Sequence, residues 1–122
     1  MNTEQFDKVL NSRLEKTRQV LGVKAKEYVR NGDRLHNFNV AAQRRGSTRE
    51  RILDGYLLKH LMSYEDMLDD IEKGNLPSYS YIDEKIGDII NYFILQEACI
   101  VQTIKEHEAK VSTSKPAAGN GG

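Results

Sequence analysis

Apolar residues recur every three or four positions along most of the chain, which is the spacing of helices with one apolar face. The first such stretch runs from residue 4 to about residue 30, with Thr3 as the expected N-cap and Asn31-Gly32 as the expected stop. Gly22 weakens its middle by up to about 1 kcal/mol relative to alanine, so it forms either one long helix or two shorter ones. Its apolar positions are Phe6, Val9, Leu10, Leu14, Val20 or Leu21, and Tyr28.

Two further helices are predicted in the middle of the chain. A short one covers about Phe38 to Arg45 and ends at Gly46. Ser47 and Glu50 then have the spacing of a capping box, in which the serine is the N-cap of the next helix. That helix runs to Lys73, with Gly74 as its C-cap and Pro77 beyond. Its apolar stripe comprises Leu53, Leu57, Leu61 or Tyr64, Leu68 and Ile71.

The most apolar stretch of the chain, Tyr81–Gln96, belongs to a third long helix from about Ser80 to about Lys110. It is apolar almost all the way round, which predicts a buried helix. Glu84, Asp88 and Asn91 nevertheless recur on one stripe, with Lys85 and Tyr92 beside it. Because buried carboxylates and amides are costly unless they are paired or bound to something, this helix is the best candidate for function.

These patterns predict an all-α fold. Residues 1–110 form a single bundle of three long helices and one short helix, which suits a chain of 122 residues. Residues 111–122 are small and polar and are expected to form a disordered tail.

The net charge of zero conceals an asymmetry between the two halves of the chain. Residues 1–50 carry 11 basic and 6 acidic side chains, whereas residues 51–108 carry 5 basic and 12 acidic ones. One explanation of the asymmetry is that the two halves pack together or pair across a dimer. The other is a site in which acidic metal ligands lie opposite phosphate-binding cations. A nucleic-acid partner is not expected, because no dense basic patch with interleaved aromatics is present.

A soluble, intracellular protein is expected. No apolar run approaches the roughly 18 uncharged residues of a membrane span, and no signal-peptide core is evident at the N-terminus. Cys99 is the only cysteine, which excludes an internal disulfide and fits a reducing compartment. Its apolar helical surroundings predict a core position.

Polar residues on the two longest predicted helices are candidates for a shared site. Lys59, Ser63 and Asp66 share one face, with His60 beside them, and this face is expected to meet Glu84, Asp88 and Asn91. Such a cluster can hold a hard cation and a phosphate, or it can be an interhelical salt-bridge network.

The connecting segment Asp33–Phe38 also carries polar groups of the kind that contact ligands. Arg34 and Asn37 are candidates for ligand binding. Alternatively, Asp33 or Asn37 caps the short helix that follows.

Four blocks of residues, in order, resemble a set of small phage proteins related to the MazG-like, nucleotide-modification-associated domains. The third long helix is also similar to the corresponding helix of the all-α MazG-like nucleoside triphosphate pyrophosphohydrolases. The resemblance covers about residues 20–100. The blocks are Lys24/Glu27/Tyr28, Asp33/Arg34/Leu35/Asn37/Phe38, Lys59/His60/Ser63 and Glu84/Lys85/Asp88/Asn91/Tyr92.

The resemblance implies a MazG-like bundle that forms a dimer or tetramer and acts on a small-molecule nucleotide. It also implies a cytoplasmic protein, which would act in the cytoplasm of an infected bacterial host if the chain is phage-encoded. Glu84 and Asp88 are the implied catalytic residues, and with Asp66 they are the implied ligands of Mg²⁺. Lys85 replaces the second acid of the family's motif on this helix, which favours a bound phosphate over a divalent cation. The implied substrate-binding residues are Lys24, Arg34, Asn37, Lys59, His60, Lys85, Asn91 and Tyr92.

Three functions remain open at this point. The chain is a Mg²⁺-dependent nucleotide pyrophosphohydrolase, a non-catalytic protein that binds or sequesters a nucleotide signal, or a helical interaction protein whose polar stripe only packs.

Overall fold

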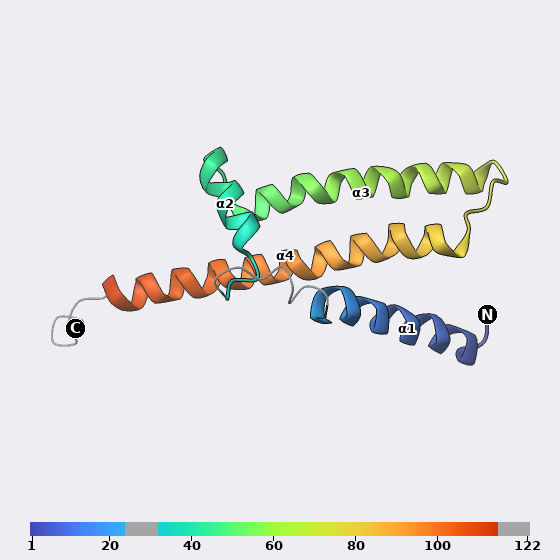
Figure 1. Ribbon diagram of the computed structural model, residues 1–122, viewed down its shortest axis with the longest axis horizontal. Helices are drawn as coiled ribbons and strands as arrows, with labels where there is room; N and C mark the ends of the chain where they lie inside the picture. Colours follow the sequence, from blue (N-terminus) through green and yellow to red (C-terminus); the bar gives the residue numbers. More distant parts are fainter. Residues whose placement is uncertain (24–31, 115–122) are drawn as a thin grey trace.

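The computed structural model describes residues 1–23 and 32–114, and these ranges contain helices and no strand (Figure 1). The helices are α1 (Thr3–Arg18), a π-helical segment η1 (Gln19–Val23), α2 (His36–Arg45), α3 (Arg49–Glu72) and α4 (Tyr79–Ser114). The all-α class is therefore confirmed, with three long α-helices and one short one.

The framework is a hairpin of α3 and α4, which run antiparallel and side by side (Figure 1). Its core is built from Leu53 and Leu57 of α3, Cys99 of α4 and Leu35, which precedes α2. Leu53 and Cys99 are completely buried, so the predicted core position of Cys99 is confirmed. Phe38, Leu61, Ile89, Tyr92 and Leu95 pack around this core.

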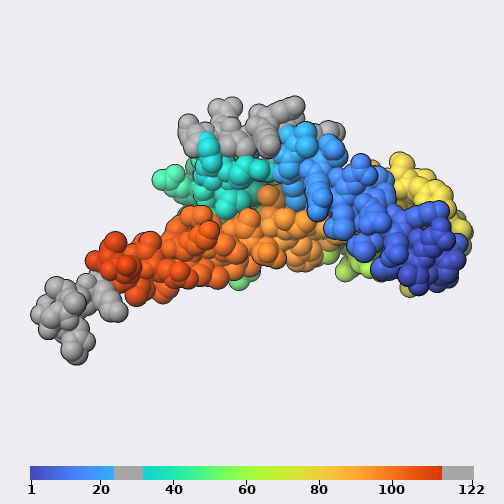
Figure 2. All heavy atoms as spheres, turned by 90° about the horizontal axis from the view of Figure 1, so that it is seen from below, coloured from blue at the N-terminus to red at the C-terminus, as the bar shows by residue number. Residues whose placement is uncertain are grey.

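The other two helices pack against the hairpin. The helix α2 packs on the start of α3, and α1 lies along α4 (Figure 1). Figure 2 shows α1 near the end where α3 and α4 are joined, and the last turns of α4 extending away from the rest of the molecule. No helix in the described ranges is long and apolar enough to cross a membrane.

The end of α2 at Gly46 was predicted correctly, whereas the end of α3 and the helix starts were displaced by one or two residues. Gly46 (φ 60°) is the C-cap of α2, in the left-handed conformation that glycine adopts at little cost. The C-cap of α3 is Lys73, one residue before the predicted Gly74, which follows it with a φ of 85°. The N-cap of α3 is Thr48, whose side chain accepts from the backbone N–H of Arg51 at 3.2 Å, so the predicted Ser47 cap is wrong.

The N-cap of α1 is Asn2, in a capping box with Gln5, and not the predicted Thr3. Its α-helix ends at Arg18, before Gly22, so the stretch does not form one continuous α-helix. The remainder of the predicted stretch, including Lys24 and Tyr28, lies outside the described residues. At the other end, α4 continues to Ser114, beyond the predicted end near Lys110; residues 115–122 of the predicted tail also lie outside the described residues.

The predicted burial of Tyr81–Gln96 on nearly all sides is wrong for the single chain. α3 covers one side of α4 and α1 a second side, but Phe93 remains 52% exposed and Ile94 46% exposed. The predicted apolar stripe of α3 is also only partly buried. Leu53 and Leu57 are in the core, whereas Met67 is buried in place of Leu68 and Ile71, which are exposed.

Candidate functional site

A cluster of aromatic, acidic and imidazole side chains lies between α3 and α4. It comprises Tyr56 and His60 of α3, Asp88 and Tyr92 of α4, and Phe38 of α2, and it is called the His60 cluster below. The His60 and Tyr92 rings are 4.8 Å apart, and the Tyr56 ring stacks on Tyr92 at 6.4 Å with an interplanar angle of 14°. Phe38 meets Tyr56 edge-on at 6.3 Å. The antiparallel hairpin thus brings together three predicted site residues, His60, Asp88 and Tyr92.

The electrostatics of the cluster depend on the protonation of His60. His60 Nδ1 lies 3.6 Å from Asp88 Oδ2, which is too long for a hydrogen bond but close enough for an ion pair when the imidazole is protonated. Burial raises the pKa of the Tyr92 phenol, and the Asp88 carboxylate and Tyr56 raise it further. Tyr92 therefore stays protonated at neutral pH and can donate a hydrogen bond.

Two polar atoms of α4 next to the cluster, Asn91 Oδ1 and Gln96 Oε1, have no partner in the described part of the chain. Asn91 Oδ1 is buried and accepts no hydrogen bond there, which costs about 1–3 kcal/mol for a buried polar group. Asn91 is three residues from Asp88, so the two side chains are neighbours on the surface of α4. A ligand that donates a hydrogen bond would satisfy this oxygen.

Other predicted site residues lie at the margin of the cluster. Lys59 is exposed, because it is turned about 100° from His60 around α3. Lys85 is mostly covered: its Nζ lies 5.2 Å from the centre of the Tyr81 ring and 3.7 Å from Glu84 Oε1. Glu84 is itself 61% exposed, and its carboxylate extends into solvent.

The carboxylates predicted to hold Mg²⁺ do not converge. Asp66 is exposed on α3, and within residues 1–23 and 32–114 no three His, Cys, Asp or Glu side chains are grouped as a metal ion requires. A magnesium ion held by Asp66, Glu84 and Asp88 therefore stays a prediction that rests on the resemblance.

The Asp33–Phe38 segment is used to start α2. Asp33 Oδ1 accepts from the backbone N–H of Leu35, and Asp33 Oδ2 accepts from Asn39 Nδ2, both at 2.9 Å. The N-cap of α2 is nevertheless Leu35, with no side-chain cap hydrogen bond, so the expectation that Asp33 or Asn37 caps this helix is wrong. Arg34 donates to the backbone carbonyl of Leu21 and lines a groove of about 510 Å³ that also includes Lys105 of α4. Asn37 is exposed on α2.

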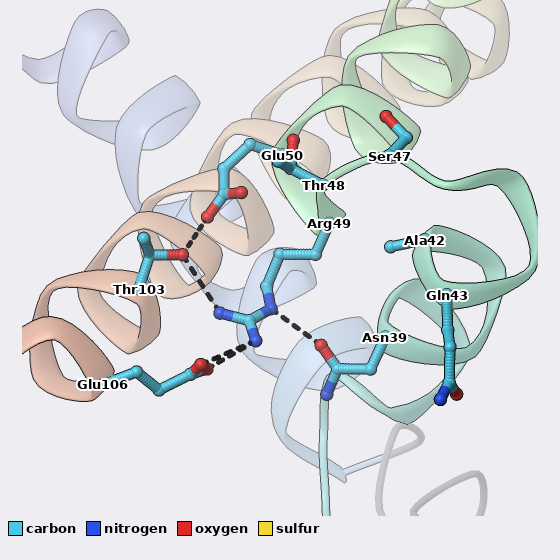
Figure 3. Close-up of a pocket in the computed structure, with 9 residues that line it drawn as sticks. All are labelled: Asn39, Ala42, Gln43, Ser47, Thr48, Arg49, Glu50, Thr103 and Glu106. Atoms are coloured by element: carbon cyan, nitrogen blue, oxygen red, sulfur yellow. Dashed lines mark hydrogen bonds and ion pairs between the residues drawn. The ribbon is translucent and has the colours of Figure 1, made fainter. Parts of the chain in front are cut away.

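A polar network centred on Arg49 was not predicted from the sequence (Figure 3). Its guanidinium donates to Asn39 Oδ1 at 2.7 Å, to Thr103 Oγ1 at 3.0 Å and to the Glu106 carboxylate. Thr103 in turn donates to Glu50. The network lines a surface cavity of about 430 Å³, and all three nitrogens of the guanidinium already donate to groups of α2 and α4. Its role is to join three helices.

Fold and site together define an all-helical protein built on an antiparallel hairpin, with an aromatic and acidic cluster between its two long helices. Comparison of the chain with family models, with curated proteins and with solved structures found no match.

Proposed function

We propose that the chain binds a nucleotide at the His60 cluster without hydrolysing it. The observation that carries this proposal is the stack of Tyr56, Tyr92 and His60, in which the outermost ring, Tyr56, is 50% exposed. An exposed ring on a fixed aromatic platform is a surface on which a base can stack. Stacking of a base on an aromatic side chain contributes about 1–3 kcal/mol.

The polar groups around the stack complement the rest of a nucleotide. Lys59 is three residues from Tyr56 on α3, within reach of a phosphate attached to a base on that ring. Asn91 Oδ1 is buried and lacks a hydrogen-bond donor among the described residues, so it can accept from a ligand only if binding opens a path to it. The same blocks of residues carry the resemblance to MazG-like proteins, which supports a nucleotide as the ligand.

Binding is favoured over hydrolysis by the arrangement of the charges. Lys85 lies against Glu84, the acid that would have to join Asp88 in holding Mg²⁺. A lysine in this position neutralises part of the negative charge that a divalent cation requires. The same lysine can contact a phosphate directly.

Calorimetric titration of the chain with a panel of ribo- and deoxynucleotides, with and without Mg²⁺, tests the proposal. At least one nucleotide is expected to bind, and Tyr56→Ala is expected to weaken it about tenfold or more. Tyr79→Ala is the matched control, because Tyr79 is 93% exposed at the start of α4, away from the cluster.

Two results would overturn the proposal. The first is no heat and no thermal stabilisation with any nucleotide. The second is Mg²⁺-dependent release of pyrophosphate that is lost in Asp88→Ala, which would establish the enzyme instead of the binder.

A further inference from the structure

The groove that contains Arg34 and Lys105 lies between α4, the segment η1 and the residues that lead into α2. Its volume of about 510 Å³ is within the range of small-molecule sites, about 300–1,000 Å³. All three parts of the chain contribute apolar side chains to it, which are Leu21, Leu35, Ile94, Leu95, Ala98 and Val101. Its described lining shares no residue with the His60 cluster, so the groove is a separate candidate site.

The wall that α4 supplies is an apolar stripe that ends in a lysine. Its members follow one another at intervals of four, three and four residues, and they are Ile94, Ala98, Val101 and Lys105. They therefore lie within about 60° of one another around the helix, over a length of about 16 Å. Ile94 is 46% exposed and Val101 42% exposed, so the stripe presents apolar surface to solvent.

Two cations border this apolar surface. Within residues 1–23 and 32–114, Lys105 has no carboxylate at ion-pair distance. Arg34 donates through Nη2 to the backbone carbonyl of Leu21, and its Nε and Nη1 have no acceptor in the same ranges. Both side chains can therefore pair with an anion in the groove.

The carboxylate of Asp33 also lines the groove, but both of its oxygens are already used. One accepts from the backbone N–H of Leu35 and the other from Asn39 Nδ2, each at 2.9 Å. With Asp33 set against Arg34 and Lys105, the described lining carries one net positive charge. A ligand with a single negative charge would balance it.

We infer that the groove binds a straight-chain carboxylate of the fatty-acid type. Arg34 and Lys105 attract the carboxylate, and the chain covers Ile94, Ala98 and Val101. A guanidinium presents parallel N–H groups that match a planar carboxylate. A phosphate monoester would bring about one further negative charge at neutral pH. The described lining has no aromatic ring on which a base could stack, which separates this site from the proposed nucleotide site.

Calorimetric titration of the chain with dodecanoate, below the concentration at which it forms micelles, tests the inference. One molecule is expected to bind per chain. Hexanoate is expected to bind at least about a hundredfold more weakly, because each buried methylene strengthens binding about fourfold.

Two variants test whether dodecanoate occupies the groove. Lys105→Glu is expected to weaken binding about tenfold or more, and Ala98→Trp to abolish it by filling the groove. Both positions are exposed, so the circular dichroism spectrum should remain helical. Lys110→Glu and Ala109→Trp are the matched controls, because Lys110 and Ala109 are exposed on α4 and do not line the groove.

Tyr56→Ala should leave dodecanoate binding within about twofold of the original, because the inference is independent of the proposed nucleotide binding. The inference is overturned if dodecanoate gives neither saturable heat nor thermal stabilisation, or if hexanoate binds equally well. Equal affinities in Lys105→Glu and Lys110→Glu would also overturn it. So would binding of the chain to phosphatidylglycerol vesicles without binding of free dodecanoate, which would assign the groove to a membrane surface.

Discussion

Arg49 joins α3 to both α2 and α4. Its side chain is only 17% exposed, and its guanidinium donates to groups on these two helices. Arg49→Ala leaves Asn39 and Thr103 without this donor, and we expect a loss of about 2–3 kcal/mol in the free energy of unfolding. Arg49→Lys should not restore it, because an ammonium group lacks the planar fork. Denaturant unfolding measures both.

Arg45→Ala provides the control for Arg49. Arg45 is exposed in the last turn of α2, so its removal should change stability by less than about 0.5 kcal/mol. Equal losses in the Arg45 and Arg49 variants would contradict the structural role given to Arg49.

The ion pair of Arg49 with Glu106 gives folding a pH dependence. The hydrogen bond from Arg49 is the main cause that holds the pKa of Glu106 below its ordinary value of 4.5. Because the folded pKa is lower than the unfolded one, the carboxylate stabilises the fold above pH 4.5, and this contribution is lost as the pH falls through the folded pKa.

We therefore expect Glu106→Gln to be less stable than the original chain at pH 7, by under about 1 kcal/mol because Glu106 is partly exposed. The difference should shrink as the pH falls below 4.5 and through the lowered folded pKa. Denaturant unfolding over a series of pH values from 7 downward measures it, and a difference that stays constant across the series would contradict the assignment.

At the scale of the helices, two glycines test how α1 is docked. Both Gly55 and Gly87 lie inside helices, but a Cβ at Gly55 meets no atom within 4 Å, whereas one at Gly87 would lie 2.5 Å from Arg13 Nη1. Gly55→Ala should raise stability by about 0.5–1 kcal/mol through helix propensity. Gly87→Ala should not show this increase in the free energy of unfolding, because the guanidinium of Arg13 must move away from Asp83.

Hydrogen exchange locates the effect of Gly87→Ala. None of the residues of α1 is fully buried, so its docking depends on the ion pairs of Arg13 and Lys16 with Asp83. Protection of the α1 amides should fall in Gly87→Ala and stay unchanged in Gly55→Ala. Equal protection in the two variants would show that α1 docks without Arg13.

The helices could be predicted from the sequence because their signals are local. Gly46 was correctly predicted as the C-cap of α2, and Gly74 lies one residue beyond the C-cap of α3, in the left-handed conformation that glycine favours. The start of α3 was displaced because Ser47 and Thr48 are both competent N-caps, and tertiary packing decides between them. The Arg49 network could not be predicted, since Arg49 and Thr103 are 54 residues apart.

The candidate site was partly predictable from the order and the lengths of the helices. An antiparallel hairpin must bring the middle of α3 against the first half of α4, so His60, Asp88 and Tyr92 meet as expected. Spacing alone does not give the rotation of each helix. A rotation of about 100° separates His60, in the cluster, from Lys59, in solvent.

At the scale of the whole molecule, ion pairs join the basic first half of the chain to the acidic second half. Arg13 and Lys16 pair with Asp83, and Arg49 pairs with Glu106. The charge asymmetry is therefore used, at least at these positions, to pack the two halves together.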